Sequence, residues 1–157
     1  MMLSMKHAIT KELPERFRIA VSVNVIVAKG DAYLLLRRAN TGWADGYYTL
    51  PAGHVDGNEA LTAAAVRETK EEVGIDVQPE DLELVHVMHR SNKEDDQERL
   101  DFYFLARKWR GEPYLAEPEK SDHLDWFSAA GVPDRTLEHV KSTLVKYESQ
   151  LLSEVNW

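Results

Sequence analysis

The stretch GHVDGNEALTAAAVRETKEEVGI, residues 53–75, decides how the rest of this chain is interpreted. Its middle part predicts a helix, because Asn58 is a suitable N-cap and Glu59 suits the positive end of a helix dipole. Gly74 stands where a residue in the left-handed conformation commonly ends a helix. We therefore expect a helix that follows a turn-rich loop and stops at a glycine.

Three acidic residues lie close together on this expected helix. At about 100° per residue, Glu68 and Glu72 fall on the same side one turn apart, with Glu71 beside them. Small and apolar residues share the same arc, namely Leu61, Ala64 and Ala65. The acids therefore share a packed face of the helix and do not stand on a purely solvent-exposed one.

Such a cluster is unfavourable by itself. Glu68 and Glu72 are like charges at i,i+4, and Glu71 and Glu72 crowd the negative end of the helix dipole. Arg67 can neutralise only part of this charge. A bound divalent cation would offset the whole cluster, and oxygen ligands without cysteine favour Mg²⁺ or Mn²⁺ over zinc. The alternative is a solvated charge run with one weak ion pair, which is common on protein surfaces.

The spacing around the cluster resembles the Nudix box, G-x5-E-x7-R-E-U-x-E-E-x-G-U, in which U is bulky and apolar. Every fixed letter is present: Gly53, Glu59, Arg67, Glu68, Glu71, Glu72 and Gly74. The one departure is Thr69 at the first U position, where its methyl group can still pack. The resemblance implies an α/β fold, the Nudix α/β/α sandwich, with a mixed sheet on which the box helix and a C-terminal helix pack.

The resemblance also assigns roles by position. Glu68 and Glu72 would be the principal metal ligands, and Glu71 a further ligand or the general base. Arg67 would hold these carboxylates in place. The backbone carbonyl of Ala52, just before the box, would be offered to the metal, although Pro51-Ala52-Gly53 replaces the Pro-Gly-Gly of many relatives. Glu59 would organise the turn between the loop and the helix.

A second resemblance lies downstream of the box. The run from Trp109 to Pro113, followed three residues later by Glu117, is similar to the MutT-type segment W-x-G-E-P-x-x-x-E. There the last glutamate reaches the metal site, so Glu117 is the expected fourth carboxylate, with an ordinary loop acid as the alternative. Glu98 and Asp101 are reserve candidates for the same role.

Candidate phosphate-binding residues flank the box. Arg38 sits where MutT-type relatives place an arginine near the substrate's phosphates, and Arg37 precedes it. His54 follows the box glycine, where such enzymes can carry a lysine. Each of the three has a plain surface role as its alternative. Aromatic side chains that could stack on a base are Trp43, Tyr47, Tyr48, Trp126 and Phe127, although such residues more often belong to the core or rim.

The rest of the chain predicts strands and one further helix. Alternation over 19–27 places Ile19 and four valines on one face and Ala20, Ser22 and Asn24 on the other. The other predicted strands cover 33–37, 47–50, 82–89, 100–109 and 124–127, with a hairpin loop over 92–98. Apolar residues spaced by three and four after Pro133 predict an amphipathic helix that closes the chain.

Composition bounds the protein's class. The chain has 157 residues, enough for one domain (1–157), with 1–16 as a candidate mobile N-terminal segment. Its 19 basic and 27 acidic residues give a net charge of −8, which argues against sequence-independent nucleic-acid binding. No cysteine, signal peptide or membrane-length apolar run is present, so we expect a cytoplasmic protein that makes no membrane contact.

Residues and resemblance together predict an enzyme. The expected reaction is Mg²⁺-dependent hydrolysis of a nucleoside diphosphate linked to a moiety X. The leading form is MutT-like cleavage of a (d)NTP to the monophosphate and pyrophosphate. The alternatives are an ADP-ribose or nucleotide-sugar pyrophosphatase and a non-catalytic Nudix-like binding module. The partner is a small-molecule nucleotide, and the resemblance allows a homodimer because many relatives are dimers.

Overall fold

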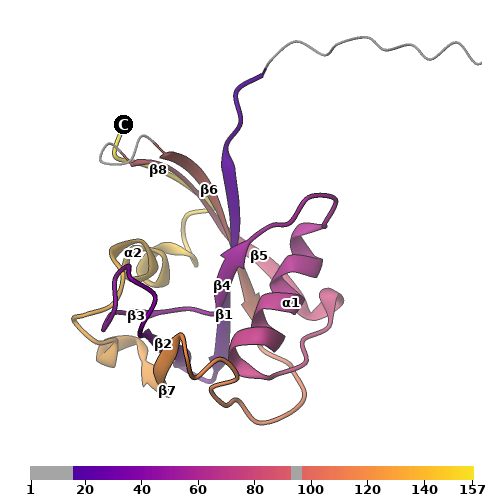
Figure 1. The fold of residues 1–157 in the computed structure, drawn as a ribbon, viewed down its shortest axis with the longest axis vertical. Helices are drawn as coiled ribbons and strands as arrows, with labels where there is room; N and C mark the ends of the chain where they lie inside the picture. The colour runs from indigo at the N-terminus through magenta and orange to yellow at the C-terminus, as the bar shows by residue number, and fades with distance from the viewer. Residues whose placement is uncertain (1–15, 93–96) are drawn as a thin grey trace, which may run out of the picture.

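The computed structural model describes residues 16–92 and 97–157 and shows a mixed β-sheet between two helices (Figure 1). The expectations for segment 1–16 and for the tip of the hairpin loop, 93–96, lie almost wholly outside these residues. The helices are α1 (Leu61–Val73) and α2 (Glu138–Lys146), and short 3₁₀ turns span Pro79–Asp81 and Ala129–Gly131. The strands are β1 (Ala20–Lys29), β2 (Ala32–Arg38), β3 (Tyr48–Thr49), β4 (Ala52–His54), β5 (Leu82–Asn92), β6 (Gln97–Ala106), β7 (Ser121–Ser128) and β8 (Leu152–Val155).

The sheet runs in the order β3-β2-β1-β6-β5-β8, with β4 paired to β1 and β7 paired to β2. Pairing of β1 with β6, and of β5 with β8, is parallel, and the remaining pairs are antiparallel. The sandwich expected from the sequence is confirmed. Among the described residues, no helix combines the length and the apolar character that crossing a membrane requires.

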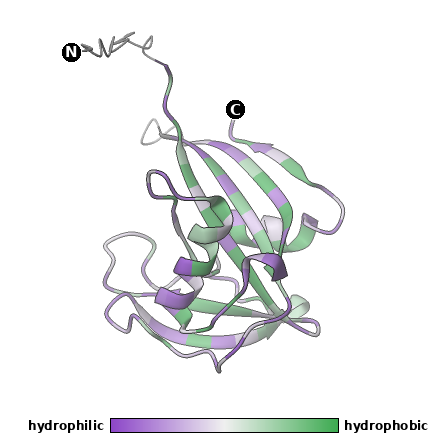
Figure 2. Cartoon of the chain, turned by 90° about the vertical axis from the view of Figure 1, so that its right-hand side faces the viewer, coloured by the Kyte–Doolittle hydropathy of each residue, from purple (hydrophilic) through white to green (hydrophobic). Residues whose placement is uncertain are grey.

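Strand β1 contributes to two cores, as its alternation predicts. Hydrophobic and hydrophilic residues alternate along the strands of the sheet (Figure 2). Val23, Val25 and Val27 belong to a core cluster with residues of α1, and Ile26 and Ala28 belong to a cluster with residues of α2. Because successive side chains of a strand point to opposite faces, Asn24 lies on the α2 side of the sheet. The even-numbered face of β1 therefore changes from polar to apolar along its length.

Helix α1 begins later than the sequence suggests. Its N-cap is Ala60, whereas Asn58 has a positive φ of 62° and forms part of the preceding turn. Asparagine tolerates this left-handed conformation, so it serves the turn and not the cap. The prediction for the other end is confirmed, because Gly74 caps the helix with φ 73°. Thr69 is fully buried and its hydroxyl donates a hydrogen bond to the Ala65 carbonyl, so it packs at the apolar box position.

The prediction that a helix closes the chain is wrong, because β8 follows α2. Strand β8 pairs with β5, and His86 anchors the segment before it. The His86 ring is buried, with Nδ1 2.6 Å from the Gln150 carbonyl and Nε2 2.9 Å from the Ser153 hydroxyl. Leu151, which continued the apolar spacing, is largely exposed. A short strand of four residues has too weak a period to be distinguished from the end of an amphipathic helix.

Strand β6 also ends before Trp109, the predicted boundary. Arg110 leaves the sheet and exchanges two backbone hydrogen bonds with Asp76, of 3.0 and 2.9 Å. This bridge directs the segment 107–120 past the C-terminal end of α1.

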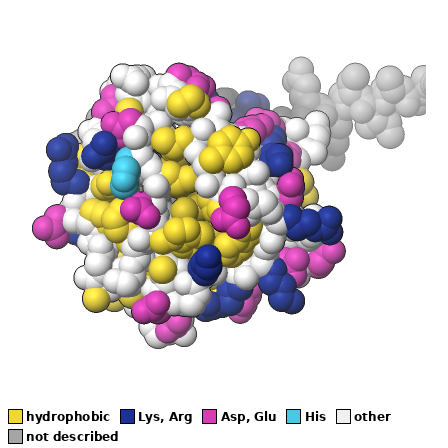
Figure 3. All heavy atoms as spheres, turned by 90° about the horizontal axis from the view of Figure 1, so that it is seen from below, with side chains coloured by type: hydrophobic (Ala, Val, Ile, Leu, Met, Phe, Trp, Pro, Cys, Tyr) yellow, Lys and Arg dark blue, Asp and Glu magenta, His cyan; other side chains and the backbone are white. Residues whose placement is uncertain are grey.

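Figure 3 shows one face of the molecule, where apolar side chains gather at the centre and charged side chains surround them.

Candidate active site

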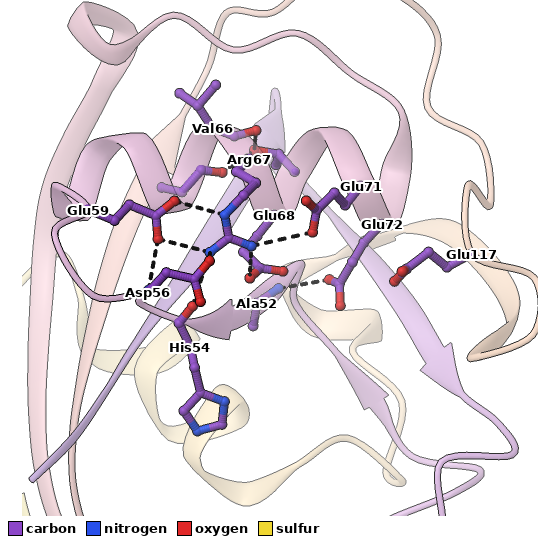
Figure 4. Close-up of polar contacts among 12 residues, drawn as sticks. Ala52, His54, Asp56, Glu59, Val66, Arg67, Glu68, Glu71, Glu72 and Glu117 are labelled. Carbon is purple, nitrogen blue, oxygen red and sulfur yellow. Dashed lines mark hydrogen bonds and ion pairs between the residues drawn. The ribbon is translucent and has the colours of Figure 1, made fainter.

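The candidate site forms where strand β4 crosses the carboxylates of α1 (Figure 4). Strand β4 pairs with β1 through Asn24–Ala52 and Val23–Gly53. A Cβ atom added to Gly53 would lie 2.1 Å from the carboxyl carbon of Glu68. The box glycine is therefore required by close approach, because any side chain there would displace Glu68.

Arg67 connects the helix to the loop before it. Its guanidinium donates to Glu59 with distances of 2.8 and 3.0 Å, to Glu68 at 2.6 Å and to Glu71 at 3.3 Å. It also donates to the backbone carbonyl of His54 at 3.1 Å. These hydrogen bonds lower the pKa of Glu59 to about 2 and raise the pKa of Arg67. The role in positioning that the resemblance assigned to Arg67 agrees with this geometry.

Glu72 points beneath the β4 strand. Its Oε2 accepts a 2.8 Å hydrogen bond from the backbone N–H of Ala52. Burial raises the pKa of Glu72 to about 8, and the negative charges of Glu68 and Glu117 raise it further against the effect of that hydrogen bond. Burial also raises the pKa of Glu68, opposed by its hydrogen bond to Arg67. Both carboxylates therefore carry a cost that a nearby cation would remove.

Glu117 is brought to the same place by the segment after Trp109. Backbone bonds attach this segment to the end of α1, from Tyr114 N–H to the Val73 carbonyl and from Ala116 N–H to the Glu72 carbonyl, both 3.1 Å. The Glu117 carboxylate points toward Glu72, and Lys120 binds it at 2.6 Å (Figure 4). The predicted fourth carboxylate thus lies beside the box acids.

The donor set fits a hard divalent cation. The candidates for holding it are carboxylates with oxygen donors only, which Mg²⁺ and Mn²⁺ prefer: Glu68, Glu71, Glu72 and Glu117. Glu68 and Glu72 each use one oxygen in the hydrogen bonds described above, which leaves the other available. Across 16–92 and 97–157, no three His, Asp or Glu side chains already converge as a finished metal site.

The two reserve acids lie elsewhere. Glu98 is paired with His89 at 2.6 Å on the β5–β6 hairpin. Asp101 is buried and both of its oxygens are occupied, one by the Ser22 hydroxyl and the other by Arg90 Nε at 2.5 Å. Neither joins the carboxylates of α1, so they are not positioned for the role held in reserve for them.

The neighbouring arginines Arg37 and Arg38 point in different directions. Arg37 forms a 2.7 Å ion pair with Asp122, and this half-exposed pair raises the pKa of Arg37 and lowers that of Asp122. Arg38 donates to the Trp43 carbonyl at 3.0 Å and lies 4.9 Å from the centre of its indole ring. The charge of Arg38 opposes the raised pKa of Glu72, and of the two arginines only Arg38 lines the cleft beside β4.

A cleft lies on the side of β4 opposite the carboxylates, so β4 borders both the cleft and the carboxylate site. The cleft encloses about 300 Å³. Several elements line it: strands β1, β3 and β4, the end of β2 with the loop that follows it, the β5–β6 hairpin and the start of α2. The lining residues are Ser22, Asn24, Arg38, Trp43, Thr49, Ala52, Gly53, His54, Arg90, Arg99, Asp101, Leu137 and His139. The predicted residues Arg38 and His54 lie here, whereas Asn24, Thr49 and His139 were not predicted. The available signal was the polar Ser22 and Asn24 alternating with valines in β1.

Comparison with known proteins identifies the family. The model of the NUDIX domain matches residues 16–147, which is most of the chain. The chain belongs to the Nudix hydrolase family. Among solved structures, this Nudix chain is similar to a MutT NUDIX hydrolase from Burkholderia pseudomallei, with a TM-score of 0.76, 25% identity, and coverage of 83% of this chain and 98% of that one.

Curated relatives of this Nudix protein differ in their activities. The NAD-capped RNA hydrolase NudC of Stutzerimonas stutzeri is 28% identical over 74% of the chain, which spans 39% of that relative's length. The ADP-ribose pyrophosphatase of Methanocaldococcus jannaschii is 27% identical over 87% of the chain and 80% of the relative. The phosphatase NudJ of Escherichia coli is 26% identical over 90% and 95%. The relatives therefore agree on the family and differ in substrate.

Proposed function

We propose that this Nudix protein hydrolyses a nucleoside diphosphate linked to a moiety X, and that its substrate is a (d)NTP cleaved to the monophosphate and pyrophosphate. The observation that carries the proposal is that Glu68 and Glu72 lie against strand β4, with Glu117 beside Glu72, and that the same strand borders a cleft of nucleotide size. The small size of the chain and the W-x-G-E-P segment favour the MutT-like form.

A divalent cation, when bound, would neutralise phosphate charge and activate water for attack on phosphorus. Glu68, Glu72 and Glu117 would hold it, together with the Ala52 carbonyl, and Mg²⁺ or Mn²⁺ suits these oxygens. Arg67 keeps Glu68 oriented through its 2.6 Å bond.

Two carboxylates are available to take the proton of the attacking water. Glu71 is half exposed. Its 3.3 Å contact with Arg67 is longer than those of Glu59 and Glu68, so Glu71 is the least constrained of the box acids. Glu117 is the other candidate and forms an ion pair with Lys120. Arg38 lines the cleft beside β4, where its guanidinium can bind a phosphate.

An ADP-ribose or nucleotide-sugar substrate is the second candidate function. The similarity to the M. jannaschii ADP-ribose pyrophosphatase, over most of both chains, favours it. All four box acids are present and positioned around Arg67 and β4, which argues against a binding module without activity.

The test is product analysis with purified protein and Mg²⁺ on a panel of nucleotides. Phosphate release that depends on added pyrophosphatase supports cleavage of a (d)NTP. Release that appears only with alkaline phosphatase, from ADP-ribose or a nucleotide sugar, supports the second function. Activity that survives EDTA, or no activity on any member of the panel, contradicts the proposal.

A further inference from the structure

The cleft behind β4 contains polar side chains that have no partner. Asn24 is only 3% exposed and Thr49 only 7%, and both line the cleft. Within the described residues neither side chain forms a hydrogen bond, although buried polar groups in folded proteins almost always do. The neighbouring pair on the same floor, Ser22 and Asp101, is fully bonded.

Among the described residues, the fully enclosed side-chain atoms without a partner belong to Tyr103 and Thr136, so the unpaired polar atoms of Asn24 and Thr49 open onto the cleft, where an occupant can bind them. Asn24 offers a donor and an acceptor side by side, and Thr49 offers a hydroxyl that can act as either. Asp101 cannot attract a cation to the cleft, because Arg90 and Ser22 already occupy its oxygens. Asn24 and Thr49 therefore suit a group that carries a donor next to an acceptor.

Trp43 adds a flat apolar surface at the rim. It is 55% exposed, although Arg38 lies over its ring. The loop that carries it is fixed by Asp45, which accepts hydrogen bonds from the Thr41 and Gly42 backbones at 3.0 and 3.1 Å. An exposed indole on a braced loop is a ready surface for stacking with an aromatic ring.

We propose that this cleft is the nucleobase subsite, in which Asn24 and Thr49 bind the edge of the base and Trp43 stacks on its face. The inference rests on the proposed function, because it assumes that the ligand is a nucleotide. A nucleotide bound in this way would reach from the base subsite to the carboxylates. Ala52 and Gly53 line the cleft on one side of β4 and contact Glu72 and Glu68 on the other. Arg38 borders both spaces and marks the path of the phosphates.

Changing Asn24 to aspartate alters which base fits. A carboxylate only accepts hydrogen bonds, and guanine presents two adjacent donors, N1–H and N2–H, on its pairing edge, whereas adenine presents a donor next to an acceptor. We therefore expect Asn24→Asp to raise the affinity for GMP relative to AMP by about tenfold or more. The matched control is Asn156→Asp, which adds the same charge to an exposed residue outside the cleft and should leave the ratio unchanged.

The measurement is calorimetric titration of the full chain with AMP, GMP, CMP and UMP in the presence of EDTA, so that binding is observed without hydrolysis. Trp43→Leu should weaken all four monophosphates by about fivefold or more, because stacking does not distinguish bases. If Asn24→Asp does not fold, Asn24→Ser replaces it and should bind the four bases nearly equally. Circular dichroism decides which variant is used.

The inference is overturned if wild-type protein binds no monophosphate at millimolar concentration. It is equally overturned if folded Asn24 variants keep the wild-type order of bases and Trp43→Leu binds as tightly as wild type. Hydrolysis is measured separately. Activity on nucleotides with an unaltered base order would refute the subsite and leave the proposed function standing, whereas an altered order without any hydrolysis would do the reverse.

Discussion

The two sides of strand β4 differ in how their polar groups are satisfied. On the α1 side, Arg67 binds Glu59, Glu68 and Glu71, and Glu72 is held by a backbone N–H. On the cleft side, Asn24 and Thr49 are buried without hydrogen bonds. The first side is organised before any ligand arrives, and the second is left to be completed by one. The comparison separates the residues proposed to support the reaction from those proposed to bind the base.

The largest effect should come from Glu72→Gln. Loss of this charge removes a proposed metal ligand, so we expect turnover to fall by at least about a hundredfold. Because burial already disfavours the charged carboxylate, the melting temperature without metal should not fall. The measurements are kcat with Mg²⁺ and thermal unfolding in EDTA. Nearly normal turnover would remove Glu72 from the ligand set.

Gly53→Ala tests the close approach of β4 to the carboxylates. The added methyl would meet the Glu68 carboxyl group at 2.1 Å, so we expect a strong loss of activity, with a loss of about 1 kcal/mol or less in the free energy of unfolding because the end of a flexible side chain moves. Gly57→Ala is the matched control, since a Cβ there has nothing within 4 Å. Denaturant unfolding and kcat are measured for both variants. Equal behaviour of the two would contradict the close-packing argument.

His139, on the cleft side, should make stability depend on pH. Burial, aided by Arg90, lowers its pKa from 6.5 to about 4, and Asp101 opposes this. The unfolded chain therefore takes up the proton first, so the contribution is complete above pH 6.5 and is lost as pH falls toward 4. Between pH 7.5 and 5, wild type should lose about 2 kcal/mol more than His139→Gln in urea unfolding. Parallel pH profiles for the two proteins would contradict this.

Thr69→Val should have the smallest effect. The substitution keeps the packed volume and removes a hydroxyl that bonds only to the helix backbone, at the carbonyls of Ala65 and Val66. We expect the free energy of unfolding to change by less than about 1 kcal/mol, with kcat unchanged. Denaturant titration measures it. A large loss would mean that the departure from the usual apolar residue has a structural role of its own.

The α1 side could be predicted because its residues are close in sequence. The spacing from Gly53 to Gly74 fixes which side chains share a helix face, and the left-handed Gly74 end was predicted correctly. The first residue of helix α1 was not predicted correctly, because Asn58 suits both an N-cap and a left-handed turn. The roles assigned to the site residues stay predictions, although Glu117 lies where the downstream segment implied.

The cleft side could not be predicted in the same way. Asn24 and Thr49 come from separate strands and His139 from helix α2, and these elements meet only in the folded chain. The alternation of β1 placed Ser22 and Asn24 on one face without showing what that face meets. The direction of Arg37 depended on Asp122, which pairs with it across β2 and β7.

Strand β4 has a consequence for how the two spaces influence one another. The strand has three residues, and the backbone N–H of Ala52 is bonded to Glu72 while the same residue lines the cleft. A shift of this strand caused by an occupant on one side alters the fit on the other. Thermodynamic linkage makes that influence mutual, so any factor by which a nucleotide strengthens cation binding must equal the factor by which the cation strengthens nucleotide binding.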